Sequence, residues 1–295
     1  MALCLAISLV ARRDFVLYDQ LVRYKWWYRN GYISSTGKCF DIGESTRISI
    51  HMFESRQKEF AKKNSISLEE INFLSDNNLL EEFKVNCSAQ GNAGNGALMR
   101  LASVLLFFNR FPETAVEYSG RSGFITHGDT KAVDACRYYG ALIIAVMNNT
   151  KKDILLSKKF YDLTIKQWLN KKQLHPEIDN IANGSFQRKK GYDDGIRGKG
   201  YIVNALEAAL WTFWSTDSFE KGVLSAVNLG DDTDTIATIY GHLAGVYYGY
   251  SKLRLDWIDA IYAKEFMQCL CELIACEGDQ WRPKTEFDLQ GMSVV

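Results

Sequence analysis

The sequence predicts an all-α protein, and three observations support that prediction. Only three prolines occur, at 112, 176 and 283, so long stretches are free to form helices. Apolar residues recur at helical spacing in several segments, and the alternation that marks strands is rare. The 295 residues, 47% of them hydrophobic, suffice for one large core or two ordinary ones. We see no linker or repeat, and we expect a compact single-domain orthogonal helical bundle over residues 1–295.

The first predicted helix lies at the start of the chain. Residues 1–10 are almost wholly apolar. A signal peptide would carry its positive charge before such a stretch, but here Arg12 and Arg13 follow it, so a buried helix fits better. No Ser, Thr, Asp or Asn precedes the helix to cap its free N–H groups. We therefore expect that a segment is missing upstream; the alternative is a frayed first turn.

Further helices follow from capping signals and apolar stripes. Ser67 and Glu70 form a capping-box pattern that predicts a helix start. Residues 131–147 are apolar nearly all round, which predicts a central, enclosed helix with Asp129 as its N-cap. Two stripes indicate buried helix faces. One consists of Leu206, Ala209, Leu210 and Phe213, and the other of Ile258, Ile261, Tyr262, Phe266, Cys269, Leu270 and Leu273.

Charge and cysteine content exclude several classes of protein. Lys plus Arg and Asp plus Glu both number 35, so nothing favours nucleic acid or an anionic membrane as a partner. The short basic run at 187–190 is typical of a solvated loop. The seven cysteines are scattered without a CxxC pair, which indicates reduced thiols in a cytoplasmic protein. No run of 18 apolar residues predicts a membrane span.

The most informative segment is Gly230-Asp231-Asp232-Thr233-Asp234-Thr235. Asp232, Asp234 and Thr235 place two carboxylates and a hydroxyl within four residues, at a turn that leads into a helix. Hard oxygen ligands at this spacing suit Mg²⁺, Mn²⁺ or Ca²⁺, although the pattern of an EF-hand is not met. Ordinary helix capping is the alternative. The following helix carries Gly241, Gly245 and Gly249, which predict a close helix–helix contact.

Three other loops contain candidate residues, each with a plainer alternative. Gly91-Asn92-Ala93-Gly94-Asn95-Gly96-Ala97 precedes an apolar run, and its backbone N–H groups suit a phosphate, but a plain turn fits as well. Asp41 suits a general base, a ribose contact or an Asx-turn. His127 precedes the predicted central helix, where histidines are more often structural than catalytic.

In this order, the segments resemble the ADP-ribosylglycohydrolase family. The run ending at Thr235 is similar to the family's C-terminal metal motif, and residues 95–100, Asn-Gly-Ala-Leu-Met-Arg, to its Asn-Gly-Ser/Ala-x-Met-Arg segment. Phe40-Asp41-Ile42-Gly43 resembles the Phe-Asp-x-Gly loop. Thr126-His127 and Arg197-Gly198-Lys199-Gly200-Tyr201 also fall where the family has similar residues. The resemblance covers almost the whole chain.

The resemblance implies an all-α hydrolase that cleaves the bond between ADP-ribose and a modified acceptor, with two Mg²⁺ or Mn²⁺ ions in a central cleft. Asp232, Asp234 and Thr235 would be metal ligands. Asp41 would lie beside the scissile ribose as the catalytic residue. The ADP-ribose cleft would be lined by Asn95, Gly96, Ala97, His127 and Tyr201. The partner would be an ADP-ribosylated protein or a small-molecule conjugate, with the acceptor undefined.

The chain also departs from the family pattern at its beginning. The family's other metal ligands come from a Thr-Asp-Asp-Thr segment, and Met1-Ala2-Leu3-Cys4-Leu5-Ala6 resembles the residues directly after that segment. We therefore expect the single domain to lack its N-terminal metal-ligand segment and to hold one ion, or an incomplete pair. The competing hypotheses are an impaired protein that binds ADP-ribose without turnover, and a structural protein.

Overall fold

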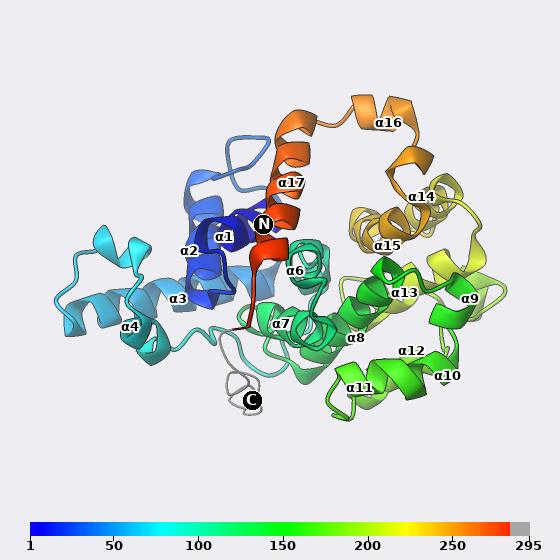
Figure 1. Ribbon diagram of the computed structural model, residues 1–295, viewed down its shortest axis with the longest axis horizontal. Coiled ribbons are helices and arrows are strands. Elements are labelled where there is room, and N and C mark those ends of the chain that lie inside the picture. Colours follow the sequence, from blue (N-terminus) through cyan, green and yellow to red (C-terminus); the bar gives the residue numbers. More distant parts are fainter. Residues whose placement is uncertain (284–295) are drawn as a thin grey trace.

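Helices account for almost all regular structure in the computed structural model, which describes residues 1–283 (Figure 1). The sole strand-like contact within that range is a bridge between Gly94 and Tyr201. The helices of the first half are α1 (Ala2–Arg12), α2 (Leu17–Asn30), α3 (Glu44–Lys63), η1 (Glu70–Phe73), α4 (Asn77–Glu82), α5 (Gly96–Met99), α6 (Ala102–Phe108), α7 (Pro112–Phe124) and α8 (Thr130–Met147). The all-α prediction is confirmed.

The second half continues with short helices and then three long ones. Its elements are α9 (Lys152–Leu155), α10 (Lys158–Phe160), η2 (Tyr161–Ile165), α11 (Lys166–Trp168), α12 (Pro176–Ala182), η3 (Gly191–Asp194), α13 (Ile202–Ser215), α14 (Phe219–Asn228), α15 (Thr233–Tyr248), η4 (Tyr250–Lys252), α16 (Leu255–Asp259) and α17 (Lys264–Gln280). None of the helices within residues 1–283 combines the length and hydrophobicity that crossing a membrane requires.

Helix α8 is the centre of the core, as its nearly uniform apolar sequence predicts. Most of its side chains are buried, and the Asp129 carboxylate caps it by accepting a hydrogen bond from the Lys131 N–H at 2.9 Å. Helix α7 packs along it most closely. A Cβ added at Gly140 would lie 2.6 Å from Ser119 Oγ, so this helix crossing requires a residue without a side chain.

Two groups of helices pack on either side of the α7–α8 pair (Figure 1). Helices α1, α2, α6 and α17 contact one another and join the pair through α6. Helices α13, α14 and α15 form the other group, and α13 and α15 both contact α8 directly. The predicted stripe of Leu206, Ala209, Leu210 and Phe213 is fully buried in α13. The predicted first helix is α1, and its residues 4–6, 8 and 9 are buried.

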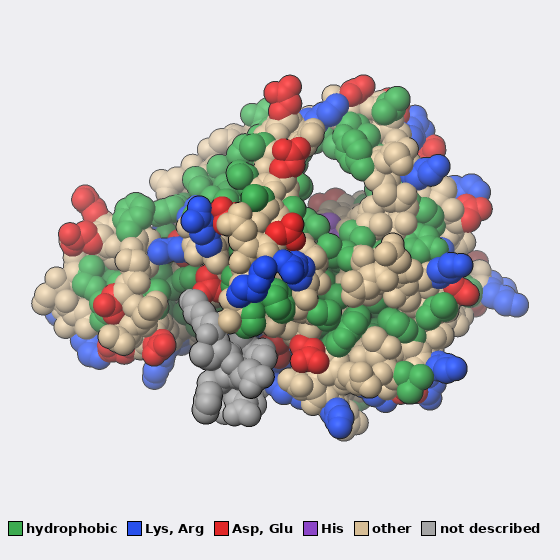
Figure 2. All heavy atoms as spheres, in the orientation of Figure 1, with side chains coloured by type: hydrophobic (Ala, Val, Ile, Leu, Met, Phe, Trp, Pro, Cys, Tyr) green, Lys and Arg blue, Asp and Glu red, His purple; other side chains and the backbone are tan. Residues whose placement is uncertain are grey.

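The second predicted stripe is wrong as a single buried face. The helix is interrupted between α16 and α17, where Ala263 adopts a left-handed φ of 54°. Phe266, Leu273 and Tyr262 are exposed, whereas α17 buries Leu270, Ile274 and Gly278 against its neighbours. Figure 2 shows hydrophobic side chains on the surface over α16 and α17. The predicted stripe ran across the break between α16 and α17. Beyond the break, α17 buries a different set of positions.

Two smaller predictions also need correction. Ser67 and Glu70 do form the reciprocal capping bonds, but they open the single turn η1 and not an α-helix. The glycines of α15 make no close helix contact within the described part of the chain, because a Cβ added at Gly241 or Gly245 would have nothing within 4 Å. The spacing of the glycines predicted a smooth face, which exists, but no described helix packs on it.

Candidate functional site

The acidic turn, defined as residues 230–235, joins α14 to α15. Gly230 and Asp231 both adopt positive φ angles, 87° and 60°, which reverse the chain sharply. The N–H of Asp232 then donates to the carbonyl of Gly198 at 2.7 Å. Asp232 occupies the N-cap position of α15, yet its side chain makes no capping hydrogen bond to the helix. The Asp232 carboxylate instead accepts a hydrogen bond from the side chain of Asn95.

Asp232 and Asp234, two of the three carboxyl groups of this turn, lie close enough to perturb each other's pKa. Burial raises the pKa of Asp232, but hydrogen bonds from Asn95 and Thr235 outweigh burial and bring that pKa below its ordinary value. The hydrogen bond shared with Asp232 raises the pKa of Asp234. Thr235 is buried, and its hydroxyl also lies 3.3 Å from Met99 Sδ, a weak acceptor. Two crowded carboxyls beside a weakly bound hydroxyl suit a hard cation.

A second loop meets the acidic turn through Asn95. The Nδ2 atom of Asn95 donates to Asp232 Oδ2 at 2.6 Å, across 137 residues of sequence. The backbone of Asn95 donates to the carbonyl of Gly200 at 3.0 Å, and Ile202 donates to the carbonyl of Ala93 at 2.9 Å. These bonds join residues 93–95, 198–202 and 230–235 into one arrangement. The loops that the sequence placed in one cleft are therefore neighbours.

His127 lies against the glycine loop, which comprises residues 91–97. Its Nδ1 shares a hydrogen bond of 2.9 Å with the Thr126 hydroxyl, and its ring faces the backbone at Gly94 and Gly96. A Cβ at Gly94 would lie only 3.2 Å from His127 Nε2. Burial and the nearby Arg100 lower the pKa of His127 to about 3, so the ring is neutral near pH 7. In this structure His127 supports the glycine loop by packing against its backbone.

Tyr201 lies at the edge of the site with two residues that the sequence did not single out. Its hydroxyl donates to a carboxylate oxygen of Glu177 at 3.1 Å. Lys131 forms an ion pair with Glu177 at 3.5 Å and lies 5.5 Å from the centre of the Tyr201 ring. Both residues sit in the first turns of α8 and α12, where charged residues are commonplace, so no sequence signal marked them.

Asp41 and Ala97 lie differently from the other candidates. Asp41 has a φ of 47° and is exposed on the loop before α3; within residues 1–283 no hydrogen bond joins it to the acidic turn. The first turn of α3 nevertheless approaches the glycine loop, since a Cβ at Gly96 would lie 3.9 Å from Thr46 Oγ1. The Ala97 side chain is buried and faces Gly123 of α7.

Protein donors for a metal are few within the described range. No group of three or more His, Cys, Asp or Glu side chains suited to a metal occurs among residues 1–283. The candidate ligands of the acidic turn are the Asp232 and Asp234 carboxylates and the Thr235 hydroxyl, a set that would suit one octahedral cation whose other positions are filled by water or ligand. The other acidic pair, Asp193 and Asp194, lies in η3, and the Asp194 carboxylate accepts a backbone hydrogen bond from Lys190.

Comparison with known proteins places these loops in a family. The profile of the ADP-ribosylglycohydrolase family matches residues 1–283. The chain belongs to the ADP-ribosylglycohydrolase family. A solved structure titled "ADP-ribosylglycohydrolase-related protein complex" superposes with a TM-score of 0.69 at 29% identity, covering 94% of this chain and 79% of that one. The ADP-ribosylglycohydrolase resemblance drawn from the motifs is thus confirmed.

Curated members of the ADP-ribosylglycohydrolase family include close relatives. ADP-ribosylarginine hydrolase Tri1 of Serratia proteamaculans is 32% identical over 281 residues, which cover 92% of this chain and 64% of that protein. Tri1 of Pseudomonas putida is 31% identical, with 92% and 63% covered. The ADP-ribosyl-[dinitrogen reductase] glycohydrolase of Rhodospirillum rubrum is 24% identical over 176 residues, with 60% and 53% covered. The chain spans less than two thirds of the length of both Tri1 proteins.

Proposed function

We propose that this chain hydrolyses the glycosidic bond between ADP-ribose and a modified acceptor, with a divalent cation held by Asp232, Asp234 and Thr235. The observation that carries the proposal is the hydrogen bond from Asn95 to Asp232, which fixes the glycine loop against the acidic turn. Membership of the ADP-ribosylglycohydrolase family supports the reaction class. The names of the Tri1 relatives make ADP-ribosylarginine the first substrate to test.

Each residue of the candidate site has a separate role in the proposed hydrolysis. Mg²⁺ or Mn²⁺ would supply charge that polarises the ribose or activates a water. Asn95 holds the Asp232 carboxylate in place by donating a hydrogen bond to one of its oxygens. The backbone around Gly96 would meet the diphosphate, and the neutral His127 ring keeps that backbone in position. Tyr201 would border the ligand, and Asp41 would act at the ribose from the loop before α3.

A second candidate is ADP-ribose binding without turnover. It is favoured by the small number of protein ligands, since residues 1–283 contain no cluster of three acidic, histidine or cysteine side chains suited to a metal. A cation held by two carboxylates and a hydroxyl would bind weakly, and a second adjacent cation would leave much charge uncompensated. The two candidates differ in one measurement, which is the release of free ADP-ribose.

The test is release of ADP-ribose from an ADP-ribosylarginine peptide, with Mg²⁺, with Mn²⁺ and with a chelator. We expect turnover with metal and a loss of at least a hundredfold with the chelator. Asp232→Ala plus Asp234→Ala should abolish turnover, because the cation loses both carboxylates, while circular dichroism keeps its helical signal. The matched control is Asp153→Ala plus Asp193→Ala, which removes two exposed carboxylates outside the site.

Three results would change the conclusion. Turnover that survives removal of Asp232 and Asp234 would end the metal mechanism. ADP-ribose binding by calorimetry, without release from any conjugate under any metal, would favour the second candidate. Absence of both binding and release would contradict both candidates.

A further inference from the structure

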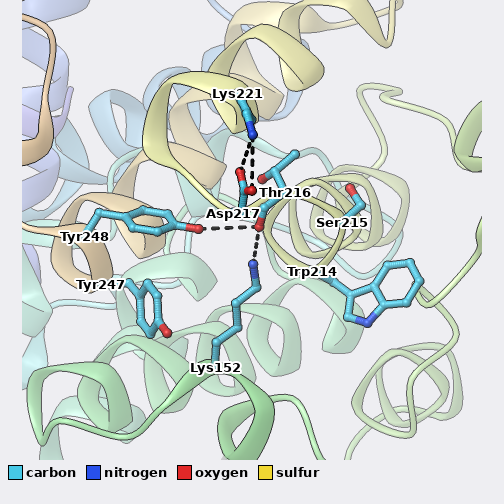
Figure 3. Close-up of a pocket in the computed structure, with 8 residues that line it drawn as sticks. All are labelled: Lys152, Trp214, Ser215, Thr216, Asp217, Lys221, Tyr247 and Tyr248. Atoms are coloured by element: carbon cyan, nitrogen blue, oxygen red, sulfur yellow. Dashed lines mark hydrogen bonds and ion pairs between the residues drawn. The ribbon is translucent and has the colours of Figure 1, made fainter.

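A cavity lies at the C-terminal end of α15, away from the acidic turn. It has a volume of about 580 Å³, within the range of small-molecule sites. Its walls come from the first residue of α9, the C-terminal end of α13, the linker that follows, the first turns of α14 and the last turn of α15 (Figure 3). The lining residues are Lys152, Trp214, Ser215, Thr216, Asp217, Lys221, Tyr247 and Tyr248.

This aromatic pocket is separate from the candidate active site. Asp234 and Tyr248 stand near opposite ends of α15, and 14 residues of helix span about 21 Å. None of its lining residues belongs to the acidic turn, the glycine loop or the Tyr201 edge. A ligand of ordinary size in one site therefore does not occupy the other.

The aromatic walls suit a flat ring. Trp214 and Tyr247 lie on opposite sides of the Lys152 side chain in Figure 3. Tyr247 is fixed by edge-on contacts with Phe213, at 5.3 Å between ring centres, and with Tyr248, at 5.0 Å. Neither the Trp214 indole N–H nor the Tyr247 hydroxyl has a hydrogen-bond partner among residues 1–283. Rigid rings with unused donors are typical of ligand-binding walls.

The charge in the pocket comes from Lys152. Its ammonium donates one hydrogen bond to the carbonyl of Thr216, which also accepts from the Tyr248 hydroxyl at 3.4 Å. It lies 4.8 Å from the centre of the Phe213 ring. An ammonium has three N–H donors, so two remain. Burial lowers the pKa of Lys152 and outweighs the nearby Asp217 carboxylate, which raises that pKa.

No carboxylate in the described range pairs with Lys152. Asp217, the acidic residue of the pocket, instead forms an ion pair with Lys221 at 2.9 Å (Figure 3). That pair is neutral overall, which leaves one positive charge among aromatic rings. A partly desolvated cation with free donors is stabilised by an anion that reaches it.

We propose that this aromatic pocket binds an aromatic anion, meaning a flat ring that carries a phosphate or carboxylate group. The ring packs against the face of Trp214, and the anionic group accepts hydrogen bonds from Lys152, whose side chain lies between Trp214 and Tyr247. Two sources share this chemistry, a nucleoside monophosphate and a free aromatic acid. The site does not depend on the proposed hydrolysis, because its residues lie outside the acidic turn.

The test measures binding by calorimetry to the whole chain with two probes, adenosine 5′-monophosphate and 2-naphthoate. Adenosine, which lacks the charge, and inorganic phosphate, which lacks the ring, serve as partial ligands. We expect at least one probe to bind, and at least tenfold more tightly than either partial ligand. Which probe binds better distinguishes the nucleotide from the aromatic acid.

Variants assign that binding to the pocket. Lys152→Gln keeps a donor for the Thr216 carbonyl but removes the charge, so we expect probe affinity to fall at least tenfold. Trp214→Leu should weaken probe binding similarly. Lys151→Gln removes the charge of the exposed neighbour outside the pocket and should leave affinity unchanged. Asp232→Ala plus Asp234→Ala should abolish hydrolysis without altering the binding that Lys152 controls.

Three results would overturn the proposal. One is that neither probe binds, and another is that inorganic phosphate binds as tightly as the probes. The third is that Lys152→Gln binds both probes as the wild type does. If binding is lost only in the Asp232 and Asp234 variant, the probe occupies the candidate active site, and the proposed hydrolysis is unaffected.

Discussion

Asn95 shows at the scale of single residues how this site is assembled. Its backbone bonds to Gly200 and its side chain to Asp232, so one residue ties together segments that are more than 100 positions apart. The sequence indicated both the glycine loop and the acidic turn, because each contains residues of unusual type at close spacing. It did not indicate the bond between them, since no local pattern encodes a contact of that separation.

Two histidines with lowered pKa values, His127 and His242, predict how stability depends on pH. The pKa of His127 is about 3 in the folded chain, and an unfolded histidine titrates near 6.5. Between these values the unfolded chain binds the extra proton, so the free energy of unfolding falls as pH falls through that window, by up to about 1.4 kcal/mol per pH unit. His242, with a pKa lowered by burial to about 4, acts in the same direction.

Urea denaturation at several pH values between 6.5 and 5 checks this prediction. His127→Asn should make the slope of unfolding free energy against pH shallower, by roughly half if His242 supplies the rest. His51→Asn, at an exposed histidine on α3, leaves His127 and His242 intact and serves as the control. A slope unchanged by His127→Asn would mean that this ring is accessible to protons in the folded chain.

At the scale of elements, the packing of α14 against α15 depends on one glycine. A Cβ added at Gly222 would lie 1.9 Å from the Tyr240 hydroxyl oxygen. That hydroxyl donates to the carbonyls of Ser218 and Phe219, at the start of α14, and Tyr240 is buried. The contact fixes the two helices that flank the acidic turn.

Two glycine substitutions with opposite outcomes test this packing. Gly222→Ala should destabilise the fold by about 2 kcal/mol, because Tyr240 must move and lose its hydrogen bonds. Gly241→Ala, on the open face of α15, should stabilise it by about 0.5–1 kcal/mol, because alanine favours a helix and nothing described obstructs its Cβ. Urea unfolding measures both, and equal effects would contradict the packing seen here.

Elements were predicted well where one physical rule determined them and poorly where two competed. Asp129 and the apolar run after it predicted α8 correctly, because a cap and uniform burial agree. The stripe through Ile261 and Phe266 failed, because hydrophobic spacing continued across a break that no proline marks. The glycine loop was expected to open one helix, but the chain forms α5 and α6, with residues 100 and 101 between them.

Over the whole molecule, the seven cysteines fall into distinct environments. Cys4, Cys87 and Cys136 are buried, whereas Cys269, Cys271 and Cys276 are exposed on α17, and none is bonded to another. Burial raises the pKa of Cys87 to about 11 and that of Cys136 to about 12. All seven cysteines are free thiols in this structure.

Brief alkylation with iodoacetamide near neutral pH tests the distribution of these thiols. Cysteines on α17 should be labelled within minutes, while Cys87 and Cys136 react only after denaturation, because a thiol must be reached and ionised to be modified. Peptide mass spectrometry identifies each labelled position. Fast labelling of Cys136 in the native chain would contradict the enclosed position of α8.

The pairing of residues 93–95 with 200–202 has a consequence for how the protein is made. When the first 150 residues have left the ribosome, α1 to α8 are present and can pack on one another, but Gly200 and Asp232 have not yet been synthesised. Joining two segments this far apart costs the conformational entropy of closing a loop of about 100 residues, which makes the contact slow to form. The glycine loop thus stays without its partners until late in translation, so premature termination yields helices without the assembled candidate site.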